Sequence, residues 1–126
     1  MQPNPPLAYA ELHCLSSFSF QRSASQPEEL VERAAALGYS ALAITDECSV
    51  AGVVRGHVHA VRLGLPFIPG AEFVDGDVTW VVLPHHLAGW GQLCQFITLA
   101  RRAAPKGQYR LPPWPRPGPA WMTWCG

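Results

Sequence analysis

The stretch PEELVERAAALGYSALAITDECSVAGVVRGHVHAVRLG, residues 27–64, decides the fold of this chain. At its centre, residues 41–45 (ALAIT) form a short, uncharged run that is mostly apolar. Such a run directly after a helical pattern is typical of a strand buried on both faces of a parallel sheet. The stretch therefore predicts a helix, a buried strand and a second helix in succession.

Start and stop signals bound the two helices. Ser25 stands three residues before Glu28 as a capping box, and Gly38 ends the first helix. Ser49 can cap the second helix, which Gly64 terminates. Helical spacing predicts the buried faces, which are Leu30, Val31, Ala34 and Leu37 in the first helix, and Val50, Val53, Val54, Val58 and Val61 in the second.

Further elements are predicted on both sides of this stretch. Residues 9–15 (YAELHCL) alternate in polarity and predict a first strand, and residues 66–69 and 78–83 (VTWVVL) predict two more. Residues 87–102 carry an apolar face at helical spacing and predict a third helix. Alternating strands and helices with short connections indicate an α/β fold with a parallel or barrel-like sheet.

Residues 112–126 (PPWPRPGPAWMTWCG) lose all periodicity. Because proline cannot donate a backbone hydrogen bond, neither a helix nor a strand ladder is expected through this stretch. It can be interpreted as a Pro-rich ligand for an aromatic groove. The favoured interpretation is a truncated coding sequence whose tail is read in the wrong frame of a GC-rich gene.

Composition limits the classes of function. The 126 residues suffice for one domain, and the net charge of zero gives no global electrostatic case for binding nucleic acid. After Asp77 every charged residue is basic, which indicates either a solvated basic face or a phosphate-binding patch. The sequence contains no Gly-rich phosphate loop, GxSxG elbow or HExxH helix.

Cysteine spacing and hydropathy indicate the compartment. The four cysteines show no CxxC spacing, so a reducing cytoplasm is expected. No basic segment precedes an apolar stretch at the N-terminus, and no run approaches the roughly 20 apolar residues that cross a bilayer. We therefore expect neither export nor membrane insertion.

Polar side chains gather at the predicted strand ends. Glu11 and His13 lie on the first strand, Asp46 and Glu47 follow the second, and Glu72 follows the third. The C-terminal ends of parallel strands meet on one face of such folds, so these groups are expected to converge. A histidine with carboxylates suits Zn²⁺ or Mn²⁺, which could activate water against a phosphate ester.

Each candidate also has a structural interpretation. His13 could be a hydrogen-bonded core histidine, and Asp46 and Glu47 could cap the helix that begins near Ser49. For Glu72 we favour a functional role, because a charged group beside buried strands needs a partner or a metal.

Four segments resemble the beginning of bacterial error-prone DNA polymerases: ELHCLSSFSF, ALAITDECSVAGV, IPGAEF and QFITLARRAAPKGQYRL. The resemblance covers residues 9–111 and is most specific in ITDECSVAGVVR. In these polymerases the matching region is a polymerase-and-histidinol-phosphatase (PHP) domain. The resemblance implies the first half of a distorted barrel of about seven β/α units, after a Pro-rich lead-in at residues 1–8.

The resemblance also implies a degraded metal site. The family's HxH motif reads His13-Cys14-Leu15 here, its TDH motif reads Thr45-Asp46-Glu47, and Glu72 matches the family's bridging glutamate. The implied ligands are therefore His13, Glu47 and Glu72, with Glu11 and Asp46 nearby and Zn or Mn as the candidate metals. An open half barrel would expose sheet edges and an apolar helix face, which predicts marginal solubility.

The leading hypothesis is a non-catalytic, structural N-terminal piece of an error-prone DNA polymerase that acts in translesion repair. The polymerase active site and the modules that bind DNA would lie downstream, and other translesion proteins are candidate partners. The alternative is a stand-alone metal-dependent phosphoesterase of the same superfamily. An interaction motif in residues 112–126 is a third hypothesis.

Overall fold

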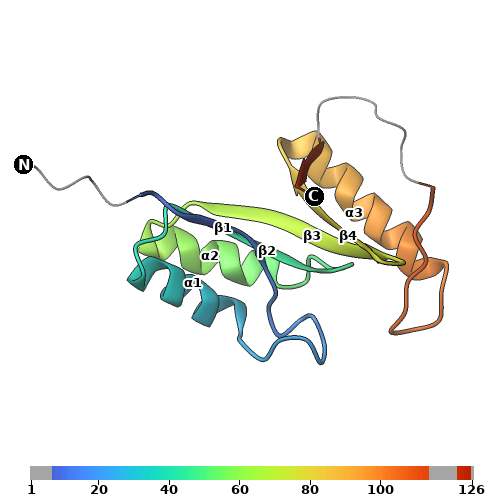
Figure 1. Cartoon of the computed structure of the whole chain (residues 1–126), viewed down its shortest axis with the longest axis horizontal. Coiled ribbons are helices and arrows are strands. Elements are labelled where there is room, and N and C mark those ends of the chain that lie inside the picture. The colour runs from blue at the N-terminus through green and yellow to red at the C-terminus, as the bar shows by residue number, and fades with distance from the viewer. Residues whose placement is uncertain (1–6, 114–121, 126) are drawn as a thin grey trace, which may run out of the picture.

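The computed structural model describes residues 7–113 and 122–125 (Figure 1). In chain order its elements are β1 (Ala10–Cys14), α1 (Pro27–Ala36), β2 (Ala41–Glu47), α2 (Val53–Leu63), β3 (Phe67–Asp75), β4 (Val78–Pro84), α3 (Leu87–Arg102) and β5 (Met122–Cys125). Among these described residues no helix is both long and apolar enough to cross a membrane. The predicted α/β fold is confirmed as a mixed, curled half-barrel sheet with helices.

The five strands form one sheet in sequence order. β1, β2 and β3 run parallel, whereas β3 and β4, and then β4 and β5, pair antiparallel. The prediction of parallel β/α units therefore holds for three strands only. β4 returns as a hairpin because a tight turn at Gly76, with φ of 60°, leaves no room for a crossover helix.

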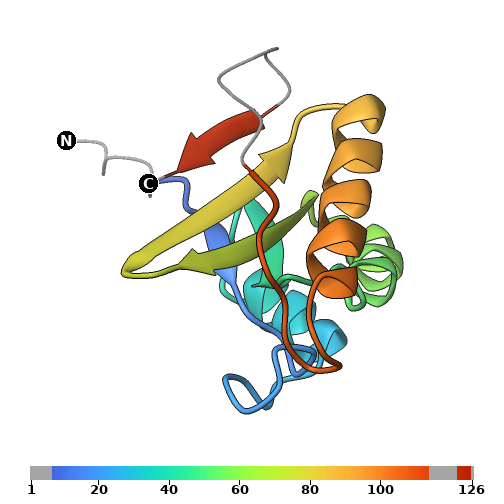
Figure 2. The same cartoon turned by 90° about the vertical axis from the view of Figure 1, so that its right-hand side faces the viewer.

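The register assigns the helices to one face of the sheet. Ile44 pairs with Pro69 and Ala71 pairs with Val82, so side chains of this parity share a face. That face packs under α1 and α2 through one buried cluster and under α3 through another. Figure 2 shows α3 beside the twisted sheet on the side where α2 also lies. Glu47 and Glu72, which pair in the register, belong to the opposite face.

The predicted buried face of α2 is right for Val53 and wrong for Val54, Val58 and Val61, which are exposed. Beside Val53 the helix buries Gly56 and Ala60. A side chain at position 56 would lie only 3.0 Å from Ile44 and Phe67, so small residues let the helix approach the sheet closely. Helical spacing indicates which residues form an apolar stripe. It cannot show that the helix turns its glycine and alanine side toward the sheet because small side chains allow the closest packing.

The helix starts also differ in detail. α1 is capped by Gln26, whose backbone N–H donates to Glu29 at 2.8 Å, one residue later than the predicted Ser25 box. α2 begins after Gly52, while the hydroxyl of Ser49 accepts from Ala51 in the turn before it. The third helix has the predicted bounds.

One part of the predicted tail is ordered into the sheet. Met122–Cys125 pair with β4, so the expectation that no strand ladder forms within residues 112–126 is wrong for these four residues. They follow the last proline of the stretch, so every one of them retains a backbone N–H. The Pro/Trp run at residues 114–121, on which the reading-frame interpretation depends, lies outside the described residues.

Candidate functional site

The loop between β1 and α1 folds over the C-terminal ends of the parallel strands. Asp46, which is 1% exposed, accepts hydrogen bonds from the backbone and hydroxyl of Ser16 at 2.7 and 2.6 Å, and from the hydroxyl of Ser19 at 2.7 Å. Ser19 in turn accepts from the backbone N–H of Glu47 at 3.1 Å. Asp46 therefore anchors the loop and does not cap α2, which has Gly52 at its start.

Glu72 is the centre of a polar cluster and its side chain is fully buried. One carboxylate oxygen contacts Nε2 of His13, and the other contacts the guanidinium of Arg22. Arg22 also donates to Oε2 of Glu47 at 3.0 Å. Hydrogen bonding to Glu72 is the main cause that raises the pKa of Arg22. One guanidinium thus joins the C-terminal end of β2 to the neighbouring strand β3.

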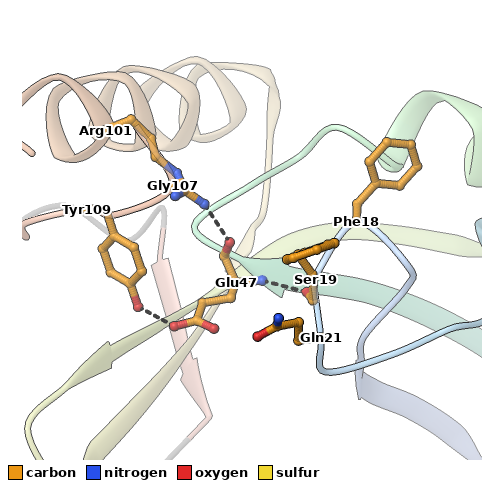
Figure 3. A pocket seen from close by; sticks show the side chains of 8 residues that line it. Phe18, Ser19, Gln21, Glu47, Arg101, Gly107 and Tyr109 are labelled. Atoms are coloured by element: carbon orange, nitrogen blue, oxygen red, sulfur yellow. Dashed lines mark hydrogen bonds between the residues drawn. The ribbon is translucent and has the colours of Figure 1, made fainter. Parts of the chain in front are cut away.

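Glu47 is held from its other side by the last turn of α3 and by the segment that follows it. Tyr109 donates to Oε1 of Glu47 at 2.8 Å, while Arg101 donates to the backbone carbonyls of Glu47 and Cys48 at 3.2 and 3.1 Å. Figure 3 shows Tyr109 and Arg101 on one side of Glu47, and Ser19 on the other. An open pocket of about 470 Å³ lies between them.

The structure brings three of the five predicted site residues into one cluster. His13 contacts Glu72 directly, and Glu47 joins them through Arg22. Asp46 lies beside this cluster but faces the serine hydroxyls. Glu11 remains apart, where it accepts from the hydroxyl of Tyr9 at 2.8 Å and from the backbone of His13 at 3.1 Å.

The cluster as arranged does not fit a divalent metal. Both oxygens of Glu72 and both oxygens of Glu47 already accept hydrogen bonds or ion pairs. The Arg22 cation lies between the two carboxylates, where it would repel a metal ion. Across the part of the chain that the structure describes, no group of three or more His, Cys, Asp or Glu could hold a metal.

Sequence reasoning did not identify Arg22, Tyr109 or the serines as members of the site. Arg22 stands in an irregular polar loop whose path no periodicity reports, and Tyr109 reaches the site only through tertiary packing. The Ser16 and Ser19 pair offered one signal, because short hydroxyl side chains beside a strand end often bind a neighbouring carboxylate or backbone group. Arg101 was grouped with a basic stretch, but its guanidinium is used inside the fold.

The PHP domain model matches residues 11–116. The chain is 59% identical over 104 residues to an error-prone DNA polymerase of Methylococcus capsulatus and 60% identical over 104 residues to one of Dechloromonas aromatica. A third such polymerase, from Ralstonia nicotianae, is 55% identical over 109 residues. Each match covers 82% of this chain but 10% of the relative, so the chain spans about a tenth of their length.

Two solved structures share the fold. A proposed metal-dependent phosphoesterase from Bifidobacterium adolescentis has a TM-score of 0.62 and 28% identity, and the match covers 79% of this chain and 35% of that one. An amidohydrolase from Chromobacterium violaceum, with bound sulfate and no metal, has a TM-score of 0.61 and 29% identity over 76% of this chain and 34% of that one. The structural similarity thus also covers only part of the matched folds.

Proposed function

The chain belongs to the PHP domain family, and from this premise we propose that it is a non-catalytic, structural part of an error-prone DNA polymerase. Translesion DNA synthesis would belong to the full-length protein, and contact with DNA would come through modules outside this chain. Other translesion proteins would be its partners, and the cytoplasm its compartment. We further propose residues 9–111 as the partial PHP domain, with residues 1–8 as a lead-in and 112–126 as a tail.

The ion pair between Arg22 and Glu72 carries this proposal. A phosphoesterase needs a metal with an open coordination position for water or substrate. Here the buried carboxylate that could bind such a metal is occupied by a guanidinium and an imidazole. The same contacts tie the β1–α1 loop to β2 and β3, which is a structural role.

A chimera tests the structural role directly. The matching segment of the Methylococcus capsulatus polymerase, which is 59% identical, would be replaced by residues 9–111 of this chain. The chimera is expected to remain soluble and to extend primers, whereas a version with the segment deleted is expected to aggregate or lose activity. A chimera that performs no better than the deletion would contradict the proposal.

A stand-alone metal-dependent phosphoesterase is the second candidate function. The contact between His13 and Glu72 at the C-terminal strand ends favours it, because imidazole and carboxylate together suit Zn²⁺ or Mn²⁺. This function would require Arg22 to leave the carboxylates. Its test is metal analysis of the purified chain, combined with hydrolysis of p-nitrophenyl phosphate by the wild type and by Glu72→Ala. Stoichiometric metal with activity that Glu72→Ala abolishes would establish the enzyme and reject the structural proposal.

A further inference from the structure

Glu72 poses an electrostatic problem that the fold must solve. Its side chain is fully buried, and its register partner Glu47 brings a second carboxylate to the adjacent strand end. Burying an ionised carboxylate costs several kcal/mol unless a cation and hydrogen bonds compensate it. Two carboxylates on adjacent strands add mutual repulsion. A folded chain therefore needs positive charge at this position.

Arg22 supplies that charge from a loop that is built to hold it. The backbone N–H of Arg22 donates to the carbonyl of Ser19 at 3.0 Å, and Ser19 is fixed by Asp46. The preceding residue, Gln21, takes a left-handed conformation with φ of 64°, which turns the chain sharply before the arginine. The guanidinium is thus placed by a defined turn and a buried anchor, although 41% of its side chain remains exposed.

A guanidinium can replace a metal ion as a counter-charge but not as a Lewis acid. It is charged at all physiological pH values, and its several N–H donors can satisfy two carboxylates at once. It has no coordination position at which to bind water. Arg22 meets this description, since the same nitrogen contacts Glu72 and lies 3.0 Å from Glu47.

We propose that Arg22 is a built-in counter-ion that takes the place of a metal in this PHP domain and makes closure of the β1–α1 loop independent of metal. This inference deepens the proposed structural function and rests on it. It assigns Arg22 as the residue that allows Glu72 to stay buried and charged. It also assigns the loop a fixed position over the strand ends.

Thermal unfolding of the full chain tests the inference. Arg22→Ala is expected to lower the Tm by at least about 5 °C, because it leaves a buried carboxylate with half of its partners. Methylguanidinium at millimolar concentration should restore part of that loss by filling the space of the missing side chain. The matched control is Arg33→Ala at an exposed position of α1, and this variant should unfold like the wild type with or without methylguanidinium. EDTA should not change the Tm of the wild type.

A second variant keeps the test decisive if Arg22→Ala fails to fold. Adding Glu72→Gln removes the charge that needs compensation, so the double variant should regain a folding transition. The inference is wrong if Arg22→Ala is as stable as Arg33→Ala, if Glu72→Gln does not rescue it, or if EDTA destabilises the wild type. If the wild type holds no metal and has no esterase activity, and Arg22→Ala does not lower the Tm, this inference alone is rejected. Metal-dependent esterase activity in the wild type would reject the proposed function as well.

Discussion

The hydroxyl of Tyr109 donates a hydrogen bond to Oε1 of Glu47 at 2.8 Å and accepts one from the backbone N–H of Val74 at 2.9 Å. One side chain from the segment after α3 thereby joins the ends of β2 and β3. Arg101 strengthens the same junction, because its guanidinium lies 5.3 Å from the centre of the Tyr109 ring. The polar cluster is therefore held by two segments far apart in the sequence, the β1–α1 loop with Arg22 and the segment after α3 with Tyr109.

Removing this hydroxyl should weaken the fold measurably. Tyr109→Phe loses two hydrogen bonds, one of them to a carboxylate, and is expected to lower the free energy of unfolding by about 1–2 kcal/mol. Tyr9→Phe is the matched control, since the Tyr9 hydroxyl binds Glu11 on an exposed part of the first strand. It should change stability by less than about 0.5 kcal/mol. Urea denaturation measures the stability of both variants. Equal losses in Tyr109→Phe and Tyr9→Phe would contradict a stabilising role for the Tyr109 hydroxyl.

Substitution of Asp46 should lower the stability of the fold more than substitution of an exposed aspartate. Its carboxylate accepts three hydrogen bonds from Ser16 and Ser19 while buried. Asp46→Asn replaces one acceptor oxygen by an N–H donor that faces other donors, which should cost about 1.5–3 kcal/mol. Asp77→Asn at the exposed hairpin turn is the control and should be neutral. If the urea midpoints of Asp46→Asn and Asp77→Asn coincide, Asp46 does not anchor the loop.

Local patterns predicted the elements well but not how they pack. The buried run ALAIT, the Gly-terminated helices and the β-prone VTWVVL all lie where expected, because these signals act within a few residues. The prediction for α2 holds for Val53 but misses Gly56 and Ala60, because these two residues carry little hydrophobic signal although they allow the closest approach. The direction of β4 depended on a two-residue turn that a strand pattern cannot distinguish from a longer connection.

The site was predictable only in its strand-borne part. His13, Glu47 and Glu72 follow from strand ends that converge, so topology alone places them together. Arg22 lies fifty residues from Glu72 and in a loop, where neither periodicity nor a motif reports its partner. Its guanidinium adds an ion pair to a cluster that the strand ends alone indicate as a metal site. Loop side chains that complete a site are in general the part that sequence patterns do not reach.

Gly70 should tolerate no side chain. A Cβ at this position would lie 2.7 Å from the carbonyl oxygen of Val82 and 2.7 Å from Leu83 on the neighbouring strand. Gly70→Ala must therefore move backbone, and we expect a loss of about 1–3 kcal/mol. Gly91→Ala on α3 meets nothing within 4 Å and should gain up to about 1 kcal/mol from helix propensity. In urea denaturation we expect Gly70→Ala to lower the free energy of unfolding and Gly91→Ala to raise it. A loss of stability in both variants would contradict this explanation.

The ion pair between Glu28 and Arg55 should contribute to stability in a pH-dependent way. A hydrogen bond from its own backbone, followed by the Arg55 guanidinium at 2.6 Å, holds the pKa of Glu28 below its usual value. A lowered pKa stabilises the fold above the unfolded value of about 4.3, and the contribution is lost as pH falls through the folded value.

A double-mutant cycle isolates this contribution. Glu28→Gln and Arg55→Ala should show a coupling of about 0.2–1 kcal/mol at pH 7, because both side chains are partly exposed. The coupling should weaken as pH falls below the unfolded value of about 4.3, and it should vanish once Glu28 is protonated in the folded state as well. Urea denaturation of the wild type, both single variants and the double variant at each pH provides the measurement. A coupling that persists at the lower pH would show that charge is not its source.

The cysteines beside the site should be unreactive while the chain is folded. Burial raises the pKa of Cys14 and of Cys48 to about 11, and both are free thiols. The thiolate is the reactive form, so at pH 8 only about one folded molecule in a thousand is reactive at each position. Unfolding returns the pKa to about 8.5 and should accelerate alkylation by iodoacetamide at least about a hundredfold. Mass spectrometry of peptides labelled with and without urea resolves each cysteine. Rapid labelling of Cys48 in buffer would mean that the end of β2 opens readily, which the contacts of Arg101 with the carbonyls of Glu47 and Cys48 should prevent.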